Sequence, residues 1–141
     1  NAKAFALALK RQGLQVEGDP EVNYTETHQV ILRVGYAKGV EVADRLENNN
    51  IIVNFQALPD DEAFIASSGL RTGVQEMARF GMKEADFGQL AEHMAAVILD
   101  KKDVSQQVSS FREKFLTMQY CLPKEQAEPL VDELVDNLVK S

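Results

Sequence analysis

Apolar positions in the first half of the chain recur with two different spacings. Residues 1–11 and 38–48 place them three and four apart, which predicts two amphipathic helices, ended by Gly13 and by a run of three asparagines. Residues 28–34 are apolar and partly β-branched over a length typical of strands, and we expect them to form the central strand. Further strands are predicted at residues 14–16 and 69–73, and another is predicted to begin with residues 51–53.

The second half of the chain is predicted to be helical. Apolar residues recur at offsets of three and four within residues 83–99, 104–116 and 130–138. We expect all three stripes to pack into the core. No repeat, low-complexity tract or linker divides the sequence, so the pattern favours a single α+β domain over residues 1–141, with a small, mostly antiparallel sheet packed with helices.

Composition narrows the classes of partner. The chain has 141 residues, of which 45% are hydrophobic, enough for one core. Its net charge of −7 and lack of a basic cluster argue against nucleic acid as a partner. A lone cysteine and the absence of any apolar run near the roughly 20 residues that cross a bilayer favour a soluble, cytoplasmic protein without a membrane partner. The chain opens at Asn1 in strong helix formers, and we expect it to be a piece of a longer protein.

Few residues suggest catalysis on their own. His28 and His93 lie far apart in the sequence with no cysteine or paired carboxylate at ligand spacing, so no metal site is predicted. His28 flanks the expected central strand and is interpreted as a structural histidine with its hydrogen bonds satisfied. The sequence contains no nucleophile elbow, phosphate loop or dinucleotide fingerprint. The acidic residues within 125–136 are interpreted as a solvated helix surface.

Arg71 is the residue with the clearest candidate chemistry. It stands between Gly69 and Gly73 at the end of an apolar run. A guanidinium is a planar, permanently charged fork of donors, and a carboxylate gripped by two parallel hydrogen bonds is its best partner. The glycines would let a backbone or a ligand approach closely. Two interpretations remain open from spacing alone: a structural ion pair on a strand, or a carboxylate-binding site.

A longer pattern surrounds this arginine. Ser68-Gly69-Leu70-Arg71-Thr72-Gly73 is followed by Arg79-Phe80-Gly81-Met82-Lys83-Glu84, and this resembles the C-terminal domain of serine hydroxymethyltransferase. Segments at residues 1–4, 28–32, 52–54 and 59–60 look like family segments in the family's order. The likeness covers residues 1–100, the α/β part of the domain, whereas residues 101–141 are interpreted as a helical extension.

The resemblance implies the small C-terminal domain of a fold type I pyridoxal-phosphate enzyme. A large N-terminal domain, absent from this chain, would hold the Schiff-base lysine and most cofactor contacts. The arginine matching Arg71 would bind the substrate carboxylate. The full-length enzyme would be a homodimer that transfers the hydroxymethyl group of serine to a reduced pterin, tetrahydrofolate or a modified pterin, leaving glycine. The isolated fragment is expected to be inactive and to bind no pyridoxal phosphate.

The sequence departs from the family pattern in three places. Val74 and Gln75 replace the usual Thr-Pro, a variant that looks closer to the archaeal-type branch. The family's Asn-Lys-Asn run reads Asn54-Phe55-Gln56, so the resemblance implies a pterin-side role for Asn54 and for the longer amide of Gln56. Arg33 stands where an aspartate is common, with no consequence that the sequence reveals.

Two other functions remain open. The chain could be the small domain of a related pyridoxal-phosphate aldolase or transaldolase that acts on another β-hydroxy amino acid. It could also be a stand-alone, non-catalytic dimerisation or regulatory module with the same fold. We further expect one face of the sheet or its flanking helices to be more apolar than a monomer prefers, which would promote self-association.

Overall fold

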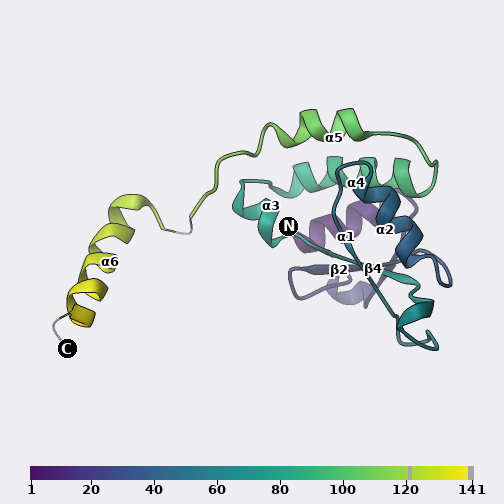
Figure 1. Ribbon diagram of the computed structural model, residues 1–141, viewed down its shortest axis with the longest axis horizontal. Coiled ribbons are helices and arrows are strands. Elements are labelled where there is room, and N and C mark those ends of the chain that lie inside the picture. The colour runs from purple at the N-terminus through teal and green to yellow at the C-terminus, as the bar shows by residue number, and fades with distance from the viewer. Residues whose placement is uncertain (121, 140–141) are drawn as a thin grey trace.

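The computed structural model describes residues 1–120 and 122–139. One helix followed by two strands occurs twice in the first half of the chain, and the second half is helical (Figure 1). In chain order the elements are α1 (Ala2–Arg11), β1 (Gln15–Glu17), β2 (Gln29–Arg33), α2 (Gly39–Glu47), β3 (Asn54–Gln56), β4 (Gly69–Gly73), α3 (Gln75–Arg79), α4 (Glu84–Ile98), α5 (Ser105–Arg112) and α6 (Lys124–Val139), with short 3-10 turns at Pro20–Val22 and Phe64–Ala66.

The four strands form one sheet in the order β1-β2-β4-β3, and every neighbouring pair is antiparallel. Successive side chains of a strand point to opposite faces. Val30 and Leu32 of β2, with Leu70 and Thr72 of β4, are buried on one face. The predicted fold class, α+β with a small antiparallel sheet, is therefore confirmed.

Helices cover this buried face of the sheet. α1 packs along α4, and the rings of Phe5 and Phe87 meet with centroids 5.4 Å apart. α2 contacts both helix α4 and the strands β3 and β4. Burial of the apolar stripes drives this packing, since each buried Phe or Leu side chain contributes about 1.5–3 kcal/mol.

The opposite face of the sheet is polar and partly exposed. The alternation places Gln29, Ile31 and Arg33 of β2 on it, all half-buried, together with exposed Arg71 of β4. We call this surface the open sheet face.

The prediction that a strand begins at Ile51 is wrong in its start, because β3 begins at Asn54. Ile51 is buried and Ile52 is 84% exposed, but the chain there is an extended connection without strand pairing. The strand begins only at Asn54, because the chain first runs alongside β4 at that point. α3, at Gln75–Arg79, is a helix that the sequence pattern did not predict.

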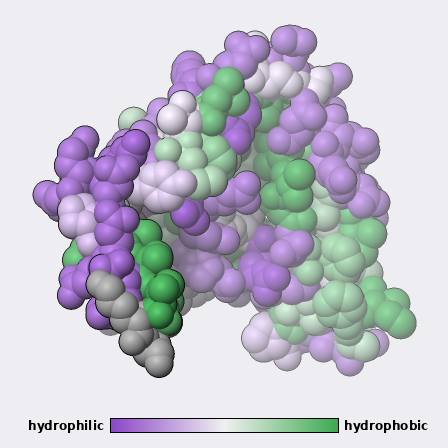
Figure 2. Space-filling view, turned by 60° about the vertical axis from the view of Figure 1, so that its left-hand side comes forward, coloured by the Kyte–Doolittle hydropathy of each residue, from purple (hydrophilic) through white to green (hydrophobic). Residues whose placement is uncertain are grey.

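The prediction that the last apolar stripe belongs to the core is also wrong. α6 starts at Lys124 rather than after Pro129, which lies inside it, and none of its described residues is buried. Leu130 and Leu134 are 56% and 60% exposed because α6 lies apart from the packed body (Figure 1). Its apolar side is visible as the green stripe at the lower left of Figure 2. Exposed apolar side chains therefore gather on α6 and in loops, and not on the open sheet face.

The two histidines differ in environment. His28 is exposed, and its interpretation as a structural histidine with satisfied hydrogen bonds is corrected: among the described residues its backbone carbonyl accepts a hydrogen bond from the Val74 amide, whereas its imidazole makes none. His93 on α4 packs edge-on against Phe111, and its buried Nε2 lacks a hydrogen-bond partner among the described residues. Burial lowers the pKa of His93.

Candidate functional site

Arg71 lies at the centre of β4. Its neighbours Leu70 and Thr72 point into the helical layer, and Thr72 donates a 3.0 Å hydrogen bond to the Val30 carbonyl. Arg71 must therefore point to the open sheet face, where it is exposed. Within residues 1–120 and 122–139 its side chain has no hydrogen bond or ion pair at contact distance. It is a cation free to take an anion from solution.

The two amides singled out by the sequence lie beside it. In the β3–β4 register Asn54 is directly opposite Arg71, and Gln56 is opposite Gly69. Residues that pair across antiparallel strands share a face, and so do residues two apart on one strand. The fold therefore brings Arg71, Asn54 and Gln56 together on the open sheet face.

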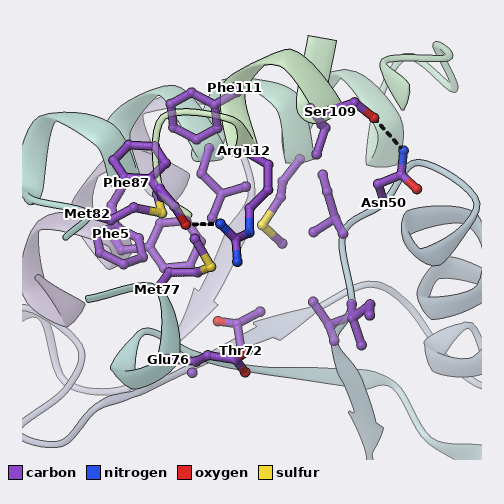
Figure 3. A pocket seen from close by; sticks show the side chains of 18 of the residues that line it. Phe5, Asn50, Thr72, Glu76, Met77, Met82, Phe87, Ser109, Phe111 and Arg112 are labelled. Carbon is purple, nitrogen blue, oxygen red and sulfur yellow. Dashed lines mark hydrogen bonds between the residues drawn. The ribbon is translucent and has the colours of Figure 1, made fainter. Parts of the chain in front are cut away.

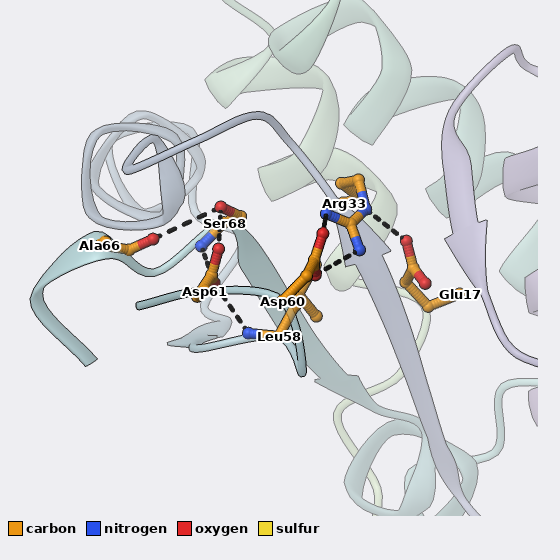
Figure 4. Close-up of polar contacts among 7 residues, drawn as sticks. All are labelled: Glu17, Arg33, Leu58, Asp60, Asp61, Ala66 and Ser68. Atoms are coloured by element: carbon orange, nitrogen blue, oxygen red, sulfur yellow. Dashed lines mark hydrogen bonds and ion pairs between the residues drawn. The ribbon is translucent and has the colours of Figure 1, made fainter. Parts of the chain in front are cut away.

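Arg33 lies on the same face but is already paired. Its Nε lies 2.6 Å from a Glu17 carboxylate oxygen, and its two terminal nitrogens each lie 2.9 Å from an oxygen of Asp60 (Figure 4). The hydrogen bonds to Asp60 and then Glu17 raise the pKa of Arg33, and the bond from Arg33 lowers the pKa of Asp60. The departure at Arg33 thus places an ion-pair cluster at this edge of the sheet.

Sequence reasoning missed the role of Asp61. The Asp61 carboxylate accepts hydrogen bonds from the amides of Leu58 and Ser68, each 2.8 Å long, and from the Ser68 hydroxyl (Figure 4). These partners lie at both ends of the loop that leads into β4. No local spacing rule reveals such a contact, because the loop has to close before its ends meet.

A hollow lies on the other side of the sheet from Arg71 (Figure 3). Its volume is about 530 Å³, and its wall includes apolar side chains from α1, α4 and α5, from α3 and from the connections at residues 51–53 and 115–116. The Arg112 guanidinium reaches into it, stacks 4.8 Å from the centre of the Phe80 ring and donates to the Phe115 carbonyl. Thr72 points toward this hollow and Arg71 away from it, so the two surfaces are separate. The mostly apolar wall of this hollow suits an apolar group.

Known proteins are similar to this chain in sequence and in fold. The family model described as serine hydroxymethyltransferase matches residues 1–94. The chain belongs to the serine hydroxymethyltransferase family.

Curated relatives named serine hydroxymethyltransferase match most of the chain. The relative from Metallosphaera sedula is 44% identical over 128 residues, covering 86% of this chain and 30% of its own length. The relative from Aeropyrum pernix is 39% identical over 144 residues, covering 98% of this chain and 32% of its own length. The chain therefore spans about a third of the length of such relatives, and the similarity continues beyond residue 100.

A solved structure shares the fold. L-threonine transaldolase from Pseudomonas fluorescens, in its internal aldimine state, aligns with a TM-score of 0.76 and 31% sequence identity. The alignment covers 94% of this chain and 32% of that one.

The open sheet face of this serine hydroxymethyltransferase-family domain suits recognition rather than bond cleavage. Arg71 can hold a carboxylate, and the two amides can hydrogen-bond a polar group. The strands β1 to β4 carry no lysine, and the two carboxylates at their edge, Glu17 and Asp60, are engaged by Arg33. These residues do not form a cradle for pyridoxal phosphate. Among the described residues no cluster of His, Cys, Asp and Glu could hold a metal ion, and no helix is long and apolar enough to span a membrane.

Proposed function

We propose that this domain is the C-terminal small domain of a cytoplasmic serine/glycine hydroxymethyltransferase, and that Arg71 binds the carboxylate of its amino-acid substrate. The observation that carries the proposal is an exposed arginine that has no carboxylate partner among the described residues and lies opposite Asn54, in a chain of this family. A large N-terminal domain would complete the enzyme, which we expect to be a homodimer. The one-third coverage of the relatives supports a larger protein.

Pyridoxal phosphate, held by the large domain, would supply the electron sink for breaking a bond at the substrate α-carbon. The contribution of this chain is orientation. A carboxylate gripped by both arms of Arg71 fixes the remaining substituents of the α-carbon in space, and such fixed geometry lowers the barrier to reaction. We expect Asn54 and Gln56 to face a reduced pterin, either tetrahydrofolate or a modified pterin, that accepts the one-carbon unit.

The test is made on the full-length protein. Arg71→Ala should weaken serine binding by about tenfold or more while leaving cofactor absorbance intact, because each charge-assisted hydrogen bond contributes about 1.5–3 kcal/mol. Arg71→Lys should recover little, since one ammonium cannot reproduce a two-bond grip. Arg11→Ala is the matched control, an exposed arginine at the end of α1. Serine titration and thermal melting separate the cases: unchanged serine affinity, or a lower melting temperature alone, defeats the assignment.

A related aldolase or transaldolase is the second candidate. It is favoured by the fold shared with L-threonine transaldolase at 31% identity. In that case Arg71 would keep its role and the one-carbon acceptor would change. Product analysis decides between them: formation of glycine from serine that requires a reduced pterin supports the hydroxymethyltransferase, and turnover of a β-hydroxy amino acid without pterin supports the alternative.

A further inference from the structure

The loop that joins β3 to β4, residues 57–68, is closed at its neck by a single side chain. Oδ2 of Asp61 accepts from the Leu58 amide at the start of the loop and from the Ser68 amide at its end. Oδ1 accepts from the Ser68 hydroxyl. One carboxylate therefore ties the end of β3 to the beginning of β4 (Figure 4).

The chain around Ser68 is held from the other side as well. The Val34 amide donates to the Ser68 carbonyl and the Gly39 amide donates to the Ser67 carbonyl, and each hydrogen bond is 2.8 Å long. Both serines are almost fully buried, at 1% and 2% exposure. The residue that precedes β4, Ser68, is therefore held by hydrogen bonds to both the loop and the chain after β2.

The loop also packs tightly on the strand. A Cβ at Gly69 would lie 2.7 Å from Cδ2 of Leu58 and 3.0 Å from the Gln56 carbonyl oxygen. Gly69 thus admits the protein's own chain, which explains one of the two glycines beside Arg71 without a ligand.

A displacement at this neck would reach the candidate site. Ser68 precedes Arg71 by three residues along an extended strand, which rises about 3.3 Å per residue and transmits a shift along its length. The same neck sets the end of β3, the strand that carries Asn54 and Gln56. The hydrogen bonds from the Ser68 hydroxyl and then the Leu58 amide lower the pKa of Asp61, so the carboxylate is charged at neutral pH.

We propose that Asp61 is a positioning residue for Arg71: by closing the neck of the β3–β4 loop it fixes where β4 begins, and thereby where the guanidinium stands opposite Asn54. This inference rests on the proposed function, because its test by serine binding assumes that Arg71 binds the substrate carboxylate. Asp61 touches neither substrate nor cofactor in this scheme. It acts through the backbone of Ser68.

The experiment uses the full-length protein with three variants. Asp61→Ala removes all three hydrogen bonds, whereas Asp61→Asn keeps one amide oxygen to accept both backbone N–H groups. Asp103→Ala is the matched control, because Asp103 accepts from the Ser105 amide at the start of α5, away from the sheet. We expect Asp61→Ala to accelerate amide hydrogen exchange in residues 67–72 and to weaken serine binding by roughly ten- to a hundredfold, the scale of an ångström-sized misplacement. Asp61→Asn should largely restore both, and Asp103→Ala should change neither.

A double-mutant cycle separates positioning from general stability. If Asp61 acts through Arg71, adding Asp61→Ala to Arg71→Ala should weaken serine binding no further. Multiplying losses, or unchanged exchange in residues 67–72, would overturn the inference. Should Asp61→Ala fail to fold, Ser68→Ala takes its place in the same double-mutant cycle, because it removes the hydrogen bond from the Ser68 hydroxyl to Asp61. Unchanged serine affinity in Arg71→Ala alone defeats the proposed function, while the exchange data still decide whether Asp61 holds β4.

Discussion

Arg33 and Arg71 project from the same face of adjacent strands, and only Arg33 is neutralised by carboxylates. Ile31 is paired with Arg71 and Arg33 with Gly69, so the two arginines are diagonal neighbours, about 7–8 Å apart by sheet geometry. Glu17 and Asp60 both bind Arg33. Of the two arginines that the described strands β1 to β4 carry, Arg71 is therefore the one left available to an incoming carboxylate.

If Arg71 binds the substrate carboxylate as proposed, removing Arg33 should weaken that binding. Arg33→Leu would leave Glu17 and Asp60 without their cation, and their negative charge would oppose a substrate carboxylate nearby. We expect serine affinity of the full-length protein to fall about two- to fivefold, the scale of exposed ion pairs, and the loss to shrink in high salt. The compensated variant Glu17→Gln/Arg33→Leu/Asp60→Asn should recover most of the affinity. A loss that persists in the compensated variant and ignores salt would contradict this account.

Gly69 and Gly88 should respond in opposite directions to alanine. At Gly69 the added Cβ would meet Leu58 and the Gln56 carbonyl, and we expect unfolding free energy to fall by about 1–3 kcal/mol. At Gly88, inside α4, a Cβ has nothing within 4 Å, so the higher helix propensity of alanine should raise it by about 0.5–1 kcal/mol. Denaturant titration of both variants measures the two changes. Equal effects would show that the close approach at Gly69 does not constrain the fold.

His93 should make the domain less stable in mild acid. Burial lowers its pKa below the ordinary value of 6.5, so the unfolded chain binds a proton more readily than the folded one. The contribution of His93 to stability is therefore fully present above pH 6.5 and is lost as pH falls below it. Denaturation at pH near 5.5 and 7.5 should show this loss in the parent. His93→Leu should abolish it, whereas His28→Gln, at an exposed position, should retain it; a slope that survives in His93→Leu would assign the effect elsewhere.

α6 should contribute little to the stability of the packed body. Because none of its described residues is buried, a chain ending at residue 122 should unfold within about 0.5 kcal/mol of the parent. The exposed stripe, which includes Leu130 and Leu134, is also the surface through which we expect the fragment to self-associate. Sedimentation of the parent, the shortened chain and Leu130→Glu/Leu134→Glu tests this. A parent that stays monomeric at high concentration would refute the self-association.

The pattern of the sequence determined the elements whose evidence is local. Helical spacing predicted α1, α2 and α4 within one or two residues of their ends, and the glycine-flanked run predicted β4 with Arg71 on it. The fold class followed from the order of these elements. Such predictions succeed because periodicity reports the face that a segment buries, whatever it is buried against.

Tertiary structure decided everything that depends on which distant residues meet. The position of β3 is set by pairing with β4 and not by its own apolar run, which lies at Ile51–Val53 outside the strand. The stripe on α6 has the spacing of a core helix, but none of the described residues of α6 is buried. Arg33 pairs with Asp60, which lies 27 residues away in the sequence, and Asp61 accepts from the Ser68 amide only when a loop closes. Long-range contacts of this kind depend on loop closure and register, which hydrophobic spacing does not encode.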